Sequence, residues 1–276
     1  MLKNIFQKYN FRPKKRLGQN FLISEKVLEQ IISVSKLKKD DIVLEIGAGT
    51  GILTIELANK VKQVIAIEKD EALVAILKKE LSKQKIKNVK IIQDDILKIK
   101  NLKFIENSKL KIKNYKVISN LPYYITAPVI KMFLENKNPP ELMILMVQKE
   151  VGERICAKPP KMSKLAIFCQ IYGLPEIMAF VSKKCFWPEP KVDSVILKIT
   201  PKNNGYKSGR SSRFVTIVKA GFCHPRKQLI NNFSKGLNLP REKVEKWLNK
   251  NNINPAQRAE TLTIKNWIGL TRTFHI

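Results

Sequence analysis

The chain has 276 residues, of which 44% are hydrophobic, enough for a large buried core and a second, smaller domain. It contains no run of 18 or more apolar residues, which excludes a transmembrane helix, and no apolar signal core follows its basic first residues. Lys and Arg number 52 against 23 Asp and Glu, a net charge of +29 that favours a polyanionic partner, nucleic acid first.

The basic residues are dense at both ends of the chain. Residues 1–16 contain six basic residues and no acid, and residues 201–276 contain 15 basic and three acidic residues. A general lysine bias of the genome is the alternative explanation, and it accounts less well for this concentration at the ends. The four cysteines have no C-x-x-C spacing and there are only two histidines. We therefore expect no metal site, and four free thiols in a reducing cytoplasm.

Helices and strands alternate along the first half of the chain. We predict helices at residues 24–36 (with Ser24 as N-cap), 52–59, 71–83 and 127–134. We predict strands at residues 42–46, 64–67, 89–93, 116–119 and 142–147. Short apolar runs separated by helices indicate a parallel sheet covered on both faces. Ligands of such sheets bind at the carboxyl ends of the strands.

The pattern changes after residue 180. A Pro-rich turn at 187–190 and a strand-like run at 192–199 predict an antiparallel addition at the edge of the sheet. Residues 201–212 resemble a linker. Beyond it we predict four helices, at 213–223, 226–234, 240–249 and 263–270. The expected domains are therefore residues 1–200 and a small helical domain at 201–276.

A glycine-rich turn follows the first predicted strand and begins a helix. It reads Leu44-Glu45-Ile46-Gly47-Ala48-Gly49-Thr50-Gly51, and glycines let a ligand lie against the main chain. Glu68 ends the next strand, where a carboxylate can accept both ribose hydroxyls of an adenosine. A dinucleotide fingerprint would need its third glycine at position 52, which is Ile52. The spacing resembles the first motif of S-adenosylmethionine-dependent methyltransferases; a turn without a ligand is the alternative.

Two carboxylates, Asp94 and Asp95, end the third strand. One of them could accept the adenine amine of an adenosine cofactor, and we prefer Asp95. The other is then a surface or capping residue.

The segment Asn120-Leu121-Pro122-Tyr123 ends the fourth strand and suits an amine substrate. An amino group conjugated to a ring is a poor nucleophile because its lone pair is delocalised. Asn120 Oδ1 and the Leu121 carbonyl can accept hydrogen bonds from its N–H groups, and Pro122 stiffens the turn without a competing N–H. Tyr123 can stack on a base that has left its stack. The alternative is a plain turn with packed tyrosines.

These motifs together resemble the ribosomal RNA adenine dimethyltransferases, most closely those that act on 16S rRNA. The resemblance rests on Asn-Leu-Pro-Tyr, the glycine turn, Gly18-Gln19-Asn20-Phe21-Leu22, and Phe186-Trp187-Pro188-Glu189-Pro190-Lys191-Val192-Asp193-Ser194-Val195. It continues into residues 226–232 and 255–260, and so spans nearly the whole chain.

The resemblance implies a Rossmann-like α/β fold, with a mostly parallel seven-stranded sheet and a small C-terminal helical domain. It implies transfer of four methyl groups, two to each of two adjacent adenosines in a hairpin loop near the 3′ end of 16S rRNA. The protein would act as a monomer in the cytoplasm, without a metal. S-adenosylmethionine would bind to Asn20, Leu22, Gly47, Glu68, Asp95 and Asn120. The catalytic residues would be Asn120, Leu121, Tyr123 and Phe186, with the two aromatic rings on either face of the target adenine.

Three other functions stay open from the sequence. A 23S rRNA adenine dimethyltransferase of the erythromycin-resistance type has much the same Asn-Leu-Pro-Tyr motif, and only the likeness of the C-terminal segments argues against it. A non-catalytic RNA- or DNA-binding factor on this fold would not need Glu68, Asp95 and Asn120. A DNA adenine methyltransferase fits the helical domain less well.

Two groups of basic residues are candidates for contact with RNA phosphates. Lys14, Lys15 and Arg16 precede the Gly18–Leu22 loop, and Arg226 and Lys227 lie in the predicted helical domain. If several of them bind phosphates, the affinity for RNA should fall steeply with salt.

Overall fold

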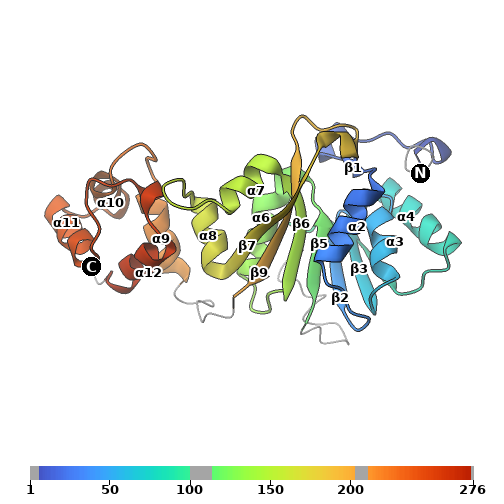
Figure 1. Ribbon diagram of the computed structural model, residues 1–276, viewed down its shortest axis with the longest axis horizontal. Helices are drawn as coiled ribbons and strands as arrows, with labels where there is room; N and C mark the ends of the chain where they lie inside the picture. Colours follow the sequence, from blue (N-terminus) through green and yellow to red (C-terminus); the bar gives the residue numbers. More distant parts are fainter. Residues whose placement is uncertain (1–5, 100–113, 203–210, 275–276) are drawn as a thin grey trace. The chain divides into compact units, whose positions relative to one another are not determined.

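The computed structural model describes residues 6–99, 114–202 and 211–274 (Figure 1). The chain divides into two compact units. The first contains the described residues up to Gly152 together with Pro175–Pro201, and the second contains Glu153–Leu174 and the described residues from Lys202 onward. Most of the linker expected at 201–212 lies outside the described residues.

A seven-stranded sheet forms the centre of the first unit, in the order β4-β3-β2-β5-β6-β9-β7. The pairs from β4 to β6 are all parallel, and β9 runs antiparallel to β6. The mostly parallel sheet expected from the sequence is therefore confirmed. Its strands are β2 (Ile42–Ile46), β3 (Gln63–Glu68), β4 (Val89–Gln93), β5 (Lys116–Asn120), β6 (Leu142–Gln148), β7 (Gly173–Val181) and β9 (Ser194–Pro201).

Helices cover this sheet, and their caps explain where several of them begin. Ser24 Oγ accepts the N–H of Val27 at the start of α2, as predicted, and Asp70 accepts that of Ala72 at the start of α4. Figure 1 shows α2, α3 and α4 beside β2 and β3, with α6 and α7 beside β6. The helices are α2 (Glu25–Val34), α3 (Ile52–Ala58), α4 (Glu71–Lys83), α6 (Thr126–Leu134) and α7 (Lys149–Ile155).

The edge of the sheet differs from the expectation. The predicted antiparallel strand is present as β9, but it lies inside the sheet between β6 and β7, so its expected edge position is wrong. β7 is the edge strand, and neither it nor α7 nor α8 (Lys164–Tyr172) was predicted. β7 contains Pro175 and exposes every second residue, which suits a sheet edge.

A two-stranded sheet is formed by segments far apart in the chain. β1 (Phe21–Leu22) pairs antiparallel with β8 (Phe186–Trp187), with Phe21 opposite Trp187 and Leu22 opposite Phe186. β8, which leads into the Pro-rich turn, therefore pairs with the N-terminal segment instead of extending the main sheet. Short 3-10 helices η1 (Lys15–Leu17) and η4 (Lys183–Cys185) precede the two strands.

The second unit is helical and packs around aromatic side chains. Trp267 stacks on Phe222 with ring centroids 5.6 Å apart and meets Phe233 edge-on at 6.2 Å. Residues 153–174 belong to this unit, not to the expected domain 1–200, because α8 contacts α12 and the Met162 N–H donates to the Glu260 carbonyl at 3.0 Å. The C-terminal elements are α9 (Ser211–Gly221), α10 (Leu229–Leu237), α11 (Arg241–Lys250), η5 (Ala259–Thr261) and α12 (Ile264–Arg272).

The helix α10 begins three residues later than the predicted start at 226. Asn232, which is fully buried, donates from Nδ2 to the carbonyls of Gly221 at 2.6 Å and His224 at 3.1 Å. These bonds hold the preceding residues in a turn, so the helix forms only after it.

Two features are absent from the described part of the chain. None of the described helices is long and apolar enough to cross a membrane. No cluster of three or more His, Cys, Asp or Glu in the same residues is placed to bind a metal ion.

Candidate active site

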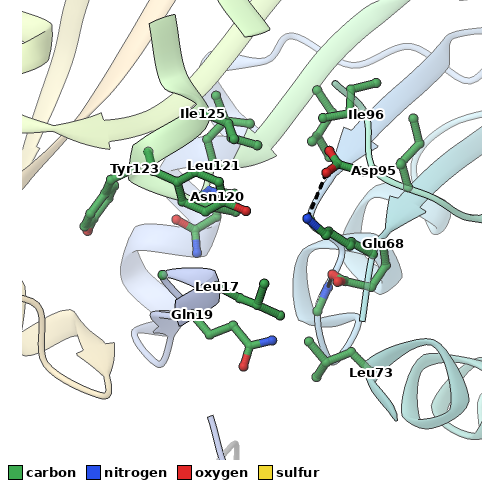
Figure 2. A pocket seen from close by; sticks show the side chains of 18 of the residues that line it. Leu17, Gln19, Glu68, Leu73, Asp95, Ile96, Asn120, Leu121, Tyr123 and Ile125 are labelled. Atoms are coloured by element: carbon green, nitrogen blue, oxygen red, sulfur yellow. Dashed lines mark hydrogen bonds and ion pairs between the residues drawn. The ribbon is translucent and has the colours of Figure 1, made fainter. Parts of the chain in front are cut away.

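The carboxyl ends of four adjacent parallel strands meet at one pocket (Figure 2). Gly47 follows β2, Glu68 ends β3, Asp95 comes shortly after β4, and Asn120 ends β5. Figure 2 shows Glu68 and Asp95 on one side of the pocket and Asn120, Leu121 and Tyr123 on the other. The pocket is lined by Leu17, Gly18, Gln19, Asn20, Phe21, Ile46, Gly47, Gly49, Ile67, Glu68, Lys69, Leu73, Asp94, Asp95, Ile96, Asn120, Leu121, Pro122, Tyr123, Tyr124 and Ile125.

The glycine turn lies close against its neighbours and needs its glycines. Gly47 has a φ of +72°, and a Cβ there would lie 3.3 Å from Pro122 Cδ. Its N–H donates to the Ile67 carbonyl at 2.7 Å. The turn is therefore attached to the end of β3 and packs on the Asn-Leu-Pro-Tyr segment, and a side chain at residue 47 would disturb both.

Glu68 is a buried carboxylate that the backbone holds in place. Its side chain accepts the N–H of Gly49 at 2.9 Å and the N–H of Asp70 at 2.8 Å, one on each oxygen. Burial raises the pKa of Glu68, and these backbone hydrogen bonds oppose the rise. Each carboxylate oxygen has two lone pairs, so both retain capacity to accept a hydroxyl from the pocket.

Asp95 forms an ion pair that the sequence did not reveal. Lys69 Nζ lies 2.8 Å from Asp95 Oδ2, the contact drawn as a dashed line at Asp95 in Figure 2. The Leu97 N–H donates to Oδ1 at 3.1 Å. Partial burial by itself raises the pKa of Asp95, but the hydrogen bond and charge of Lys69 outweigh it, so the pKa lies below its usual value. Asp94 also lines the pocket and accepts the backbone N–H of Asp95 at 2.6 Å.

Asn120 has a defined orientation. Its Nδ2 donates to the backbone carbonyl of Asn20 at 3.1 Å, while its Oδ1 accepts no hydrogen bond from the described residues. Asn20 in turn donates from Nδ2 to the Gly18 carbonyl at 3.3 Å. The amide oxygen of Asn120 is thus free to accept a hydrogen bond from a molecule that enters the pocket.

Tyr123 is half-buried, and its hydroxyl lies 2.8 Å from Ser194 Oγ on β9. Ser194 is fully buried, so the far end of the tyrosine has a fixed partner. Burial raises the pKa of Tyr123, and the Ser194 hydroxyl opposes the rise. Leu121, between Asn120 and Pro122, has its side chain buried at 2% exposure.

Two of the predicted site residues lie outside this pocket. Leu22 and Phe186 face each other across the β1–β8 pair and belong to the hydrophobic core of the first unit. Phe186 is only 2% exposed, so stacking on a base would require its ring to be uncovered. The roles of both residues stay predictions.

Comparison with known proteins identifies the family. The model of the ribosomal RNA adenine dimethylases matches residues 10–274. The chain belongs to this family. It is 41% identical to the ribosomal RNA small subunit methyltransferase A of Alkaliphilus metalliredigens, over 98% of this chain and 94% of that protein. It is 39% identical to the protein of the same name from Dehalococcoides mccartyi strain 195, over 96% of this chain and 89% of that protein.

Solved structures agree on the fold of this ribosomal RNA adenine dimethylase. A dimethyladenosine transferase from Plasmodium falciparum superposes with a TM-score of 0.74 at 26% identity, covering 91% of this chain and 95% of that one. The 23S rRNA methyltransferase ErmE superposes with a TM-score of 0.71 at 24% identity, covering 93% and 100%. At that identity the likeness to ErmE shows the fold alone.

The N-terminal segment of the dimethylase forms a wall of the pocket, and an ion pair and a hydrogen bond attach it to Asp70, the N-cap of α4. Lys14 Nζ lies 2.9 Å from Asp70 Oδ1, and Gln19 Nε2 donates to Asp70 Oδ2 at 3.0 Å. Both interactions were missed from the sequence, where Lys14 was a candidate for contact with phosphate. The only sequence signal for Gln19 was its place in the Gly18–Leu22 motif.

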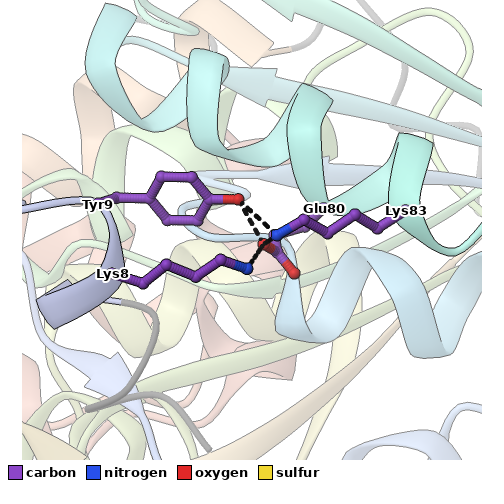
Figure 3. Close-up of polar contacts among 4 residues, drawn as sticks. All are labelled: Lys8, Tyr9, Glu80 and Lys83. Atoms are coloured by element: carbon purple, nitrogen blue, oxygen red, sulfur yellow. Dashed lines mark hydrogen bonds and ion pairs between the residues drawn. The ribbon is translucent and has the colours of Figure 1, made fainter.

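A second attachment lies farther along α4 (Figure 3). Glu80 Oε1 accepts hydrogen bonds from Tyr9 Oη at 2.6 Å, Lys83 Nζ at 2.9 Å and Lys8 Nζ at 3.3 Å. The Tyr9 hydroxyl, with help from the two lysines, lowers the pKa of Glu80 to about 2. Glu80 thus remains ionised and binds residues 8 and 9 across most of the pH range.

Glu45 is a buried acid beneath the glycine turn. It is 1% exposed, and Thr54 Oγ1 donates to its Oε2 at 2.6 Å. Burial raises the pKa of Glu45 to about 8, with a further contribution from the charge of Glu68. Glu45 is therefore mostly neutral at pH 7.

Proposed function

We propose that this chain transfers methyl groups from S-adenosylmethionine to N6 of two adjacent adenosines in the 3′-terminal hairpin loop of 16S rRNA, giving N6,N6-dimethyladenosine during biogenesis of the small ribosomal subunit. One observation carries the proposal. Glu68 and Asp95 lie on one side of the same pocket that has Asn120 and Tyr123 on the other (Figure 2). The donor and the target base can therefore bind side by side.

The residues present fit the adenosine and methionine parts of the donor. Glu68 can accept the ribose hydroxyls, Asp95 the adenine amine, and the bare backbone at Gly47 can lie against the methionine part. Asn20 completes the wall beside Asn120. Leu22, which lines a smaller neighbouring cavity with Gly47 and Asn120, would contact the donor from there. S-adenosylmethionine supplies a methyl group on a sulfonium, which is electrophilic enough for a weak nitrogen nucleophile.

The other side of the pocket prepares the amine. Asn120 Oδ1 and the Leu121 carbonyl accept hydrogen bonds from its two N–H groups and direct its lone pair toward the methyl group. As the new N–C bond forms, the sulfur–methyl bond breaks to leave a neutral thioether, and the amine releases one proton to water. Because these acceptors are in place before the reaction, catalysis consists mainly of positioning and electrostatic stabilisation. The Tyr123 ring stacks on the flipped base. A role for Phe186 on the other face of the base requires its ring, which is 2% exposed, to be uncovered.

The proposed partner is 16S rRNA in the small subunit. The names of the relatives at 39–41% identity support it, as does the net charge of +29. The 23S rRNA alternative has support only at the level of the fold.

The four cysteines are free thiols, which agrees with action in the cytoplasm. We expect a monomer, which light scattering of the purified protein would test.

The test supplies labelled S-adenosylmethionine with four separate substrates: undermethylated 30S particles, 50S particles, protein-free 23S rRNA and duplex DNA. We expect label in 30S particles alone, with mass spectrometry showing dimethyladenosine at two adjacent positions. An Asn120→Ala preparation serves as the control for a contaminating methyltransferase. Label in 23S rRNA, or RNA binding without any label, would contradict the proposal.

A further inference from the structure

The outermost strand of the sheet ends in an exposed aromatic residue. Phe180 on β7 is 62% exposed, more than any other large hydrophobic side chain in the described part of the chain. The exposure alternates along β7, so Phe180 and Met178 point to the same side of the strand. Lys149 Nζ lies 5.6 Å from the centroid of the Phe180 ring. An aromatic ring and an ammonium group thus form one exposed surface.

This surface is fixed to the wall of the candidate active site by a short series of contacts. The Asp193 carbonyl accepts the N–H of Lys149 at 2.9 Å, and Asp193 Oδ1 accepts the N–H of Lys183 at 2.9 Å. The next residue, Ser194, contacts the Tyr123 hydroxyl. A ligand on Phe180 would therefore lie along the same edge of the sheet as the base that Tyr123 is proposed to hold, with β6 and β9 between them.

The start of α7, which carries Lys149, has little freedom to move. A Cβ at Gly152 would lie 2.3 Å from Val195 Cγ2, so the helix backbone packs directly on β9. Lys184, Lys191 and Val192 are exposed in the loop around Asp193. Lys149 is thus held beside Phe180 by a helix packed on β9, and two further exposed lysines follow in the loop that leads into β9.

We propose that Phe180 and Lys149 form a second nucleotide position, at which an unpaired base of the rRNA next to the target adenosines stacks on the Phe180 ring while lysines contact its phosphate. Stacking on an aromatic ring tolerates any base, and lysines beside it favour the RNA backbone over an uncharged protein surface. The inference rests on the proposed function, because it names how the substrate of that site is held.

The test compares variants of the full chain with matched controls. Phe180→Ala removes the ring, Phe180→Trp keeps a stacking surface, and Leu174→Ala removes another exposed apolar side chain from the start of the same strand. Lys149→Gln removes the charge beside the ring, and Lys90→Gln removes an exposed lysine from β4 at the opposite edge of the sheet. Each variant is measured for its melting temperature, its Kd for protein-free 16S rRNA, its KM and kcat on undermethylated 30S particles, and its Kd for the methyl donor.

We expect Phe180→Ala to weaken both Kd and KM for RNA roughly tenfold, the effect of losing one base–aromatic stack, with donor binding unchanged. Phe180→Trp should retain wild-type values, Lys149→Gln should weaken RNA binding, and both controls should match the wild type. If Phe180→Ala had the same Kd for RNA and the same KM for 30S particles as Leu174→Ala, the inference would be overturned. A defect on 30S particles without one on protein-free RNA would also overturn it, in favour of a ribosomal protein contact.

The outcome for the proposed function is separate. If the wild-type protein labels no small-subunit RNA, the proposed function fails. If it does label this RNA and Phe180→Ala behaves as the wild type, only the second nucleotide position is contradicted.

Discussion

The side-chain amide nitrogen of Asn120 donates to the backbone carbonyl of Asn20 at 3.1 Å, across 100 residues of sequence. This bond settles which end of the amide is available, because the nitrogen is engaged and Oδ1 is left to accept. It also joins the N-terminal wall of the pocket to the carboxyl end of β5. The acceptor that an amine substrate needs is therefore oriented before any substrate binds.

The contact between Tyr123 and Ser194 should position the tyrosine ring. Tyr123→Phe keeps the ring but loses the hydrogen bond, which is worth about 1 kcal/mol, so we expect a roughly three- to tenfold higher KM for 30S particles. Tyr123→Ala should cost more because the stacking surface is lost as well. Steady-state kinetics with saturating donor would measure both.

The control for this prediction is a double-mutant cycle. Ser194→Ala should reproduce the effect of Tyr123→Phe, and the double variant should be no worse than either single one. Additive effects would show that the two hydroxyls act independently and would contradict the positioning role.

Glu45 should make the stability of the protein depend on pH. The pKa of Glu45 is about 8 in the folded protein, against an ordinary value of 4.5. As the pH rises, Glu45 therefore ionises in the unfolded chain before it ionises in the folded protein. The contribution of Glu45 is therefore full below about pH 4.5, falls as the pH rises toward 8, and is lost above that. Urea unfolding at several pH values should show the free energy of unfolding falling by an amount on the order of a few kcal/mol over this window.

Glu45→Gln is the matched variant, since its amide oxygen can still accept the Thr54 hydroxyl. In this variant the free energy of unfolding should fall less steeply with pH than in the wild type. Some dependence on pH should remain, because burial also raises the pKa of Glu68. Parallel curves for the wild type and the variant would show that Glu45 is ionised in the folded protein.

Glu80 should keep the N-terminal segment on α4. Glu80→Gln removes the charge that Tyr9 and the two lysines contact, and Tyr9→Phe removes the hydroxyl alone. The pKa of Glu80 is about 2, against an ordinary value of 4.5. The contribution of Glu80 to stability is therefore present above pH 4.5 and is lost only as the pH falls toward 2. Exposed ion pairs contribute about 1 kcal/mol or less, so we expect little change in melting temperature.

The effect should instead be local. Hydrogen exchange at residues 6–20 should become faster in Glu80→Gln, and the KM for the methyl donor should rise, because this segment forms one wall of the pocket. Exchange unchanged from the wild type in this segment would rule out the anchoring role.

The sequence predicted the parallel half of the sheet well and its edge poorly. The strands β2, β3, β5 and β6 are short, mostly apolar runs with mostly buried side chains, which is typical of parallel strands covered on both faces, and β4 at the other edge of the sheet continues their alternation with helices. β7 has no such signal, because it alternates exposed and partly buried residues and contains Pro175. Without β7, the antiparallel strand β9 was placed at the edge, although it is buried on both sides by β6 and β7.

The site residues at strand ends could be predicted because parallel strands place their carboxyl ends together. Contacts between distant segments could not. Nothing in the sequence pairs Lys69 with Asp95 or Lys14 with Asp70, since surface lysines are numerous and any of them could have been the partner. The burial of Phe186 likewise follows from the β1–β8 pair, which joins segments about 165 residues apart.

The central claim is that donor and target base occupy opposite sides of one pocket, and the most direct measurement compares Asn120→Ala with Glu68→Gln. Donor affinity by calorimetry and the single-turnover rate on undermethylated 30S particles are measured for each. We predict that Asn120→Ala keeps donor affinity within about fivefold but loses roughly 100- to 1,000-fold in rate. Glu68→Gln should weaken donor binding roughly tenfold or more while its rate at saturating donor falls much less. An Asn120→Ala protein with a near-normal rate would contradict the account.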